Sequence, residues 1–111
     1  MFKRGLHKRD KGTDITYRNN PDHVLSPDNY DIVLKARFKK IDPKVFKKYY
    51  IELISSRWKN RKEEFKDLLK LGLNGDVTLI CYCGKKEKDC HAQYAVDFMN
   101  NLIKKIKSKP T

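Results

Sequence analysis

All three cysteines of the 111-residue chain lie in one short segment, together with a histidine. These residues are Cys81, Cys83, Cys90 and His91. Thiolate and imidazole groups act as nucleophiles, as general acids and bases, and as metal ligands. An odd number of clustered cysteines argues against a framework of disulfides. The segment therefore predicts a reactive thiol, a metal site or a buried strand end.

The pattern around these residues predicts a strand, a loop and a helix. Val77–Cys83 is apolar or β-prone on both faces, which is typical of a central strand in a parallel sheet. Asp89 can cap a helix that begins with Cys90 and His91. In α/β folds, ligands bind in the crevice outside the carboxyl ends of the strands. We therefore expect the end of this strand and the start of this helix to form one site.

Cys90 and His91 are the predicted catalytic residues of that site. The positive end of a helix dipole stabilises a thiolate in the first helical turn. His91 could pair with such a thiolate or act as a general base. The backbone N–H groups at a helix start also suit phosphate or carboxylate ligands. The predicted anion-binding residues are Lys85, Lys86, Lys88 and Arg18.

Two further interpretations of the cysteines stay open. Cys81 and Cys83 share one face of the predicted strand and are interpreted mainly as small buried residues. Alternatively, these two cysteines supply the four ligands of a structural zinc site together with Cys90 and His91. Their spacing differs from that of the common zinc knuckle, and adjacent helical residues point in different directions. The sequence therefore predicts no resident cofactor, with zinc as the alternative.

A strongly basic composition is the second signal in the chain. The formal net charge is +12 and the pI is about 9.7. Such a surface attracts nucleic acid and other phosphate-bearing ligands, although lysine-rich surfaces also occur without a ligand. Lys39-Lys40 and Lys47-Lys48 are interpreted as solvated faces. No apolar run is long enough to span a bilayer, so we expect no membrane partner. We expect a monomer or a homodimer.

The length of the chain suits one domain. Residues 1–12 are predicted to form a basic arm, which can contain a short strand, and residues 13–108 a single α/β domain. No apolar segment follows the basic start, so we expect a cytoplasmic protein, or one in the host cytoplasm if the chain is viral. The expected fold is a small, Rossmann-like three-layer sandwich, in which helices flank a short, mostly parallel sheet. Thr13–Arg18 suits a short edge strand.

Start and stop signals place the expected helices. Ser26-Pro27-Asp28 predicts the start of the first helix, whose inward face includes Phe38. Asp42-Pro43 predicts the start of a second helix in the same way. Asn60 is predicted to cap a third helix, and Gly72 to end it in a left-handed conformation.

The strand ending in Cys81-Tyr82-Cys83, with Cys90-His91 opening the next helix, is the most specific motif of the chain. With the segment 26–33 and the pair Tyr49-Tyr50, it resembles the YeaO-like family, a domain of unknown function numbered four-eight-eight. That family occurs in bacteria, archaea and their viruses. The resemblance covers most of the chain after Gly12 and implies an α/β three-layer fold, without an established activity.

One residue departs from the pattern of that family. The family continues Cys-His-Arg, whereas Ala92 follows His91 here. An arginine at this position would be a natural clamp for an anion. The resemblance therefore implies that the lysines of the loop or Arg18 take its place, or that part of the site is lost.

Two hypotheses about function follow. The first is a small enzyme or ligand-binding domain with a thiol-based or anion-binding site at Cys90 and His91, acting on a phosphate-containing or nucleic-acid ligand. The alternative is a non-catalytic accessory protein that binds nucleic acid or protein, with cysteines that lie in the core or hold zinc. The first needs Cys90 in an open crevice. The second needs an accessible basic surface.

Overall fold

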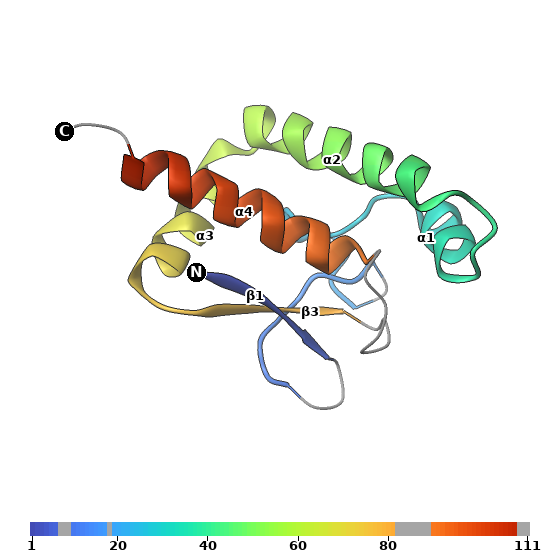
Figure 1. Ribbon diagram of the computed structural model, residues 1–111, viewed down its shortest axis with the longest axis horizontal. Helices are drawn as coiled ribbons and strands as arrows, with labels where there is room; N and C mark the ends of the chain where they lie inside the picture. The colour runs from blue at the N-terminus through green and yellow to red at the C-terminus, as the bar shows by residue number, and fades with distance from the viewer. Residues whose placement is uncertain (7–9, 18, 82–89, 109–111) are drawn as a thin grey trace.

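The computed structural model describes residues 1–6, 10–17, 19–81 and 90–108 of the chain (Figure 1). Helices and a small three-stranded sheet make up a mixed α/β fold, which confirms the predicted class. The elements are β1 (Phe2–Leu6), β2 (Thr13–Asp14), α1 (Tyr30–Arg37), α2 (Pro43–Asn60), α3 (Lys62–Asn74), β3 (Val77–Cys81) and α4 (His91–Ser108). Of the described helices, none has the length and apolar character that crossing a membrane requires.

β3 is the central strand of the sheet, as its apolar character on both faces predicted. The strand order is β1-β3-β2, and both neighbours run parallel to β3. The register places Phe2 opposite Val77 in β1, and Asp14 opposite Ile80 in β2. β2 is therefore an edge strand, as expected, and its carboxyl end lies beside that of β3.

Part of the segment expected as a basic arm belongs to this sheet. Residues 2–6 form β1, and the Phe2 side chain is only 4% exposed. The Asn100 side chain from α4 accepts a hydrogen bond from the Phe2 N–H at 2.8 Å and donates one to its carbonyl at 3.0 Å. The basic residues Lys3 and Arg4, which follow Phe2, concealed a strand that this one aromatic side chain anchors in the core.

The helices stack on the sheet through α4. This helix packs on β1 and β3, and α2 packs on α4, so α4 lies between the sheet and α2 (Figure 1). Aromatic and aliphatic side chains fill the space between these elements. They include Leu79 of β3, Phe46, Tyr50 and Ile54 of α2, Phe65, Leu68 and Leu69 of α3, and Tyr94, Ala95, Met99 and Ile103 of α4.

The predicted start of the first helix at Ser26 is wrong. The helix begins at Tyr30, and the Asn29 side chain caps it by accepting a hydrogen bond from the Ile32 N–H at 3.2 Å. Ser26 is instead buried and donates its hydroxyl to the carbonyl of Asn20. The Ser-Pro-Asp signal thus belongs to a buried turn that precedes the helix.

Two further predictions about helix ends and faces are wrong. Phe38 does not face inward: it lies at the carboxyl end of α1 with 65% of its surface exposed. Asn60 is the last residue of α2, and α3 follows Arg61 without a side-chain cap. A helical spacing predicts which residues share a face, but it does not predict where the helix ends. Here α1 ends at Arg37, one residue before Phe38.

Gly72 does not end α3 in a left-handed conformation. It lies within the helix, and none of the described glycines has φ in the left-handed region. A Cβ atom at Gly72 would lie 2.4 Å from Cε2 of Phe2 and 3.1 Å from Cδ1 of Ile103. The glycine is therefore present because the Phe2 ring packs directly on the helix backbone.

This contact yields a stability prediction. Gly72→Ala should lower the free energy of unfolding by about 1–3 kcal/mol, because overpacking the Phe2 ring outweighs the better helix propensity of alanine. Gly75→Ala is the matched control, since a Cβ there meets nothing within 4 Å. Urea unfolding of both variants measures the difference. Equal stability of the two variants would contradict the packing role of Gly72.

Candidate functional site

The two predicted catalytic residues lie at the start of α4, in the interior of the protein. Cys90 directly precedes the helix and is 1% exposed, and His91 is its first residue and is 6% exposed. Both side chains are therefore buried and do not line an open crevice. A nucleophilic thiol must reach its substrate, so their catalytic role stays a prediction that this burial does not favour.

His91 joins the start of α4 to the chain segment that follows β2. Its Nε2 lies 3.0 Å from the carbonyl oxygen of Ile15. A carbonyl only accepts hydrogen bonds, so this ring nitrogen carries the proton and donates it. The edge of the imidazole also packs on the Tyr50 ring, with 5.7 Å between ring centroids. His91 therefore fixes the edge of the sheet against α4 and α2.

Tyr50 covers this pair from α2. It is fully buried, and its hydroxyl donates a hydrogen bond to the carbonyl of Leu25 at 2.5 Å. Burial raises the pKa of Tyr50 well above 10; the positive charge of Arg57 lowers it, and nearby Cys90 raises it. The phenol thus stays protonated at neutral pH and acts as a hydrogen-bond donor.

The neighbouring carbonyls are bound by Arg57, which lies two helical turns further along α2. Its Nη1 donates to the carbonyls of Val24 at 3.0 Å and His23 at 3.3 Å, and also to that of Ser26. Burial, together with the positive charge of Arg61, lowers the pKa of Arg57 from its usual range. Its guanidinium therefore serves the backbone of this segment rather than an anionic ligand.

A polar network closes the carboxyl end of β2. One carboxylate oxygen of Asp14 accepts from the N–H and hydroxyl of Thr16 at 2.8 and 2.7 Å, and the other accepts from the Asn19 amide at 2.9 Å. The network holds the turn residues that are described after β2, which include Tyr17 and Asn19. The strand before that turn does neighbour β3, as a shared crevice requires, but Arg18 itself lies outside the described residues.

The remaining predicted anion and metal ligands cannot be placed. Lys85, Lys86, Lys88 and Cys83 lie outside the described residues, and Cys81 is described only as the last residue of β3. Within the described ranges, no three His, Cys, Asp or Glu side chains are grouped so that they could hold a metal ion. The anion site at the loop and the zinc alternative therefore stay predictions.

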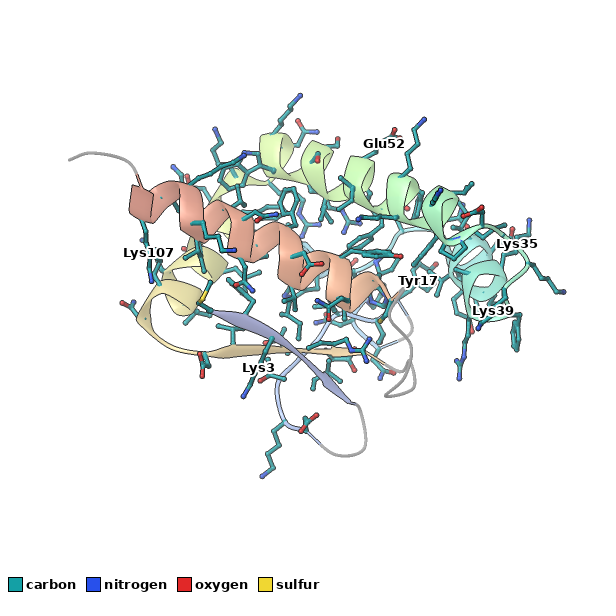
Figure 2. All side chains as sticks on the ribbon, in the orientation of Figure 1. Lys3, Tyr17, Lys35, Lys39, Glu52 and Lys107 are labelled. Atoms are coloured by element: carbon teal, nitrogen blue, oxygen red, sulfur yellow. The ribbon has the colours of Figure 1, made fainter. Side chains whose placement is uncertain are left out.

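A different surface gathers the charge of the chain. Residues 35–48, which we call the α1–α2 corner, comprise the end of α1, the connecting turn and the start of α2. They include seven basic residues and one acidic residue, and so carry half of the net charge of +12. All seven are exposed: Lys35, Arg37, Lys39, Lys40, Lys44, Lys47 and Lys48. Figure 2 shows Lys35 and Lys39 at the same end of the molecule.

The turn within the corner has a fixed and strained backbone. The N–H of Lys40 bonds to the carbonyl of Lys35 at 2.7 Å, and that of Lys39 to the carbonyl of Ala36 at 3.1 Å. This pair of bonds is a Schellman motif, which usually has glycine in the left-handed position. Lys39 occupies that position with φ of 57°, at a cost of about 1 kcal/mol relative to glycine.

Sequence reasoning missed the corner as a site. Its lysine pairs were interpreted as solvated faces, and they are exposed, but two helices bring them onto one surface. That surface also carries exposed apolar side chains, with Phe38 at 65% and Val45 at 58%. A pocket between the helices is lined by Ala36, Ile41 and Phe46, and by Lys39 and Lys40. The density of basic residues in 35–48 was the available signal.

The burial of Cys90 predicts a slow thiol. Cys90 should react with iodoacetamide much more slowly in the folded protein than in denaturant, because its side chain is inaccessible. Peptide mapping by mass spectrometry after timed labelling measures this difference for Cys90 alone. Equal labelling in both conditions would contradict its burial and would favour the reactive-thiol hypothesis.

His23 predicts a loss of stability in acid. Burial, and next the positive charge of Arg61, lower its pKa from 6.5, and its Nδ1 accepts a hydrogen bond from the Leu25 N–H at 3.0 Å. The unfolded chain therefore takes up this proton at a higher pH than the folded protein does. Stability from this group is present above about pH 6.5 and is lost as the pH falls through the lowered value.

The variant His23→Asn isolates this effect, since the Asn oxygen can accept the same hydrogen bond without titrating. Its free energy of unfolding, measured by urea at pH 7.5 and pH 5.5, should fall less on acidification than that of the wild type. The same fall in both proteins would show that His23 does not contribute.

Comparisons of the chain with family models, curated proteins and solved structures found no match in any of the three. The resemblance of its Cys-Tyr-Cys and Cys-His motifs to the YeaO-like family therefore stays a prediction.

Proposed function

We propose that this protein binds nucleic acid through the α1–α2 corner, as a non-catalytic accessory protein. The observation that carries the proposal is the corner itself, where seven exposed basic residues accompany one acidic residue. A surface of this kind binds phosphate backbones by releasing condensed counterions. The single acid, Asp42, is engaged in capping α2, where its carboxylate accepts from the Lys44 N–H at 2.8 Å.

The arrangement of the lysines supports a continuous phosphate-binding surface. Lys44, Lys47 and Lys48 have the spacing of neighbours on one side of α2. Lys39 and Lys40 lie in the turn that precedes α2, and their backbone is fixed by the Schellman motif. Fixed positions lower the entropy that binding must overcome. The long lysine side chains can then reach the phosphates of either a flexible or a helical nucleic acid.

The interior position of Cys90 and His91 supports the non-catalytic form of the proposal. His91 contacts the carbonyl of Ile15 and the ring of Tyr50, and Cys90 is 1% exposed. A thiol enzyme needs its nucleophile in a partly exposed, electropositive setting. The α1–α2 corner, which carries half of the net charge, contains no cysteine.

Neutralising the corner should weaken binding without unfolding the protein. We expect the combination Lys39→Gly, Lys40→Gln and Lys44→Gln to lower the affinity for a short oligonucleotide at least tenfold near physiological salt. The slope of log K against log salt should flatten by about 2, because three phosphate contacts are lost. Glycine relieves the left-handed backbone at Lys39, so thermal stability should be retained. Fluorescence anisotropy between about 50 and 200 mM salt measures both quantities.

The matched control removes the same charge elsewhere. Lys59→Gln, Lys70→Gln and Lys107→Gln neutralise three exposed lysines outside the corner, and Lys107 lies at the opposite end of the molecule from Lys39 (Figure 2). This variant should bind with a slope close to that of the wild type. Equal losses in both variants would show that binding is diffuse. A wild-type protein that binds no oligonucleotide at low salt would refute the proposed function.

A further inference from the structure

We infer that Phe38 is a stacking platform for an unpaired base, so that the α1–α2 corner binds single-stranded nucleic acid. This inference rests on the proposed function and names the form of its ligand. It begins from an unusual exposure: Phe38 has 65% of its surface in solvent, the largest value among the exposed large apolar side chains of the described residues. Burying a phenylalanine would contribute about 1.5–3 kcal/mol to folding, which this position leaves unused.

The exposed ring is held on a rigid backbone. The Phe38 N–H bonds to the carbonyl of Leu34 at 3.0 Å, and the next two N–H groups close the Schellman motif. The left-handed Lys39 follows directly, with φ of 57°. Strained residues of this kind concentrate at sites of function. A rigid aromatic ring also loses little freedom on binding, since only two side-chain torsions must be fixed.

Cationic residues flank Phe38 in the sequence on both sides. Arg37 precedes Phe38, and Lys39 and Lys40 follow it, all of them exposed. Proteins that bind single strands combine a positively charged path for the backbone with aromatic rings on which bases stack. The α1–α2 corner contains both components on one turn. An acidic protein partner would use the charge, but it would give no reason for a flat ring among the cations.

The ring also distinguishes a single strand from a duplex. In a duplex, neighbouring base pairs cover both faces of each base, and a protein reaches only the edges and the phosphates. In a single strand, a base can be splayed out and its face laid on an aromatic side chain. Removing the ring should therefore weaken binding to single strands and leave charge-driven binding to duplexes unchanged.

The test compares Phe38→Ala with the wild type on an oligothymidylate and on a duplex of equal length. Phe38→Ala should weaken binding to the single strand about tenfold, within the range measured for loss of one stacked base. Its affinity for the duplex and its salt slope should stay within twofold of the wild type, because no charge is removed. Phe38→Trp should restore binding, and Leu71→Ala, which removes a similarly exposed apolar side chain outside the corner, should have no effect.

A direct readout of stacking completes the test. A 2-aminopurine placed in the single strand should change its fluorescence on binding the wild type and not on binding Phe38→Ala. If Phe38→Ala weakens single strand and duplex equally, or neither, the stacking platform is refuted while the proposed function stands. If the wild type binds neither nucleic acid, the proposed function itself fails. If it prefers poly-glutamate to the single strand and loses that preference in Phe38→Ala, the corner docks an acidic protein and the inference is overturned.

Discussion

The structure depends on satisfying four consecutive backbone carbonyls in a buried turn. Residues 23–26 enter the interior without forming a helix or a strand, and buried carbonyls without partners would be costly. Tyr50 and Arg57, which share one side of α2, supply the donors. This requirement fixes the rotation of α2. Its aromatic side then meets α4, and Lys44 and Lys48 necessarily point to solvent.

The same rotation decides the environment at the start of α4. Because Tyr50 must reach the buried turn, its ring lies beside His91 and its hydroxyl near Cys90. Cys90 and His91, whose side chains could act in catalysis, therefore contribute to packing and hydrogen bonding instead. The residue type of Cys90 and its position at a helix start do not determine its reactivity. The packing of α2 decides whether this thiol is exposed to solvent or buried. The charged face of α2 and the buried Cys-His pair follow from one constraint.

Sequence reasoning correctly predicted those elements that depend only on neighbouring residues in the chain. The apolar run from Val77 gave a central parallel strand, and Asp42-Pro43 gave the start of α2. The missed features all need knowledge of a distant partner. Phe2 forms part of a strand because Gly72 and Asn100 receive it, and Ser26 is buried because α2 covers its turn. The α1–α2 corner was missed because each lysine pair looks ordinary until a turn joins two helices. Cys90 was correctly placed at a helix start, but its burial depends on α2.

The strand order has a consequence for how the chain reaches this state. β3 is the shared neighbour of β1 and β2, yet it is made last of the three strands. No ladder can form until the chain has been synthesised through Cys81, and the Phe2–Asn100 pair spans 98 residues. During synthesis, β1 must therefore wait unpaired, and helices from the middle of the chain form before any sheet exists. Such non-local pairing slows folding. Lys3 and Arg4, which follow Phe2, give this unpaired segment a positive charge that opposes association with other chains.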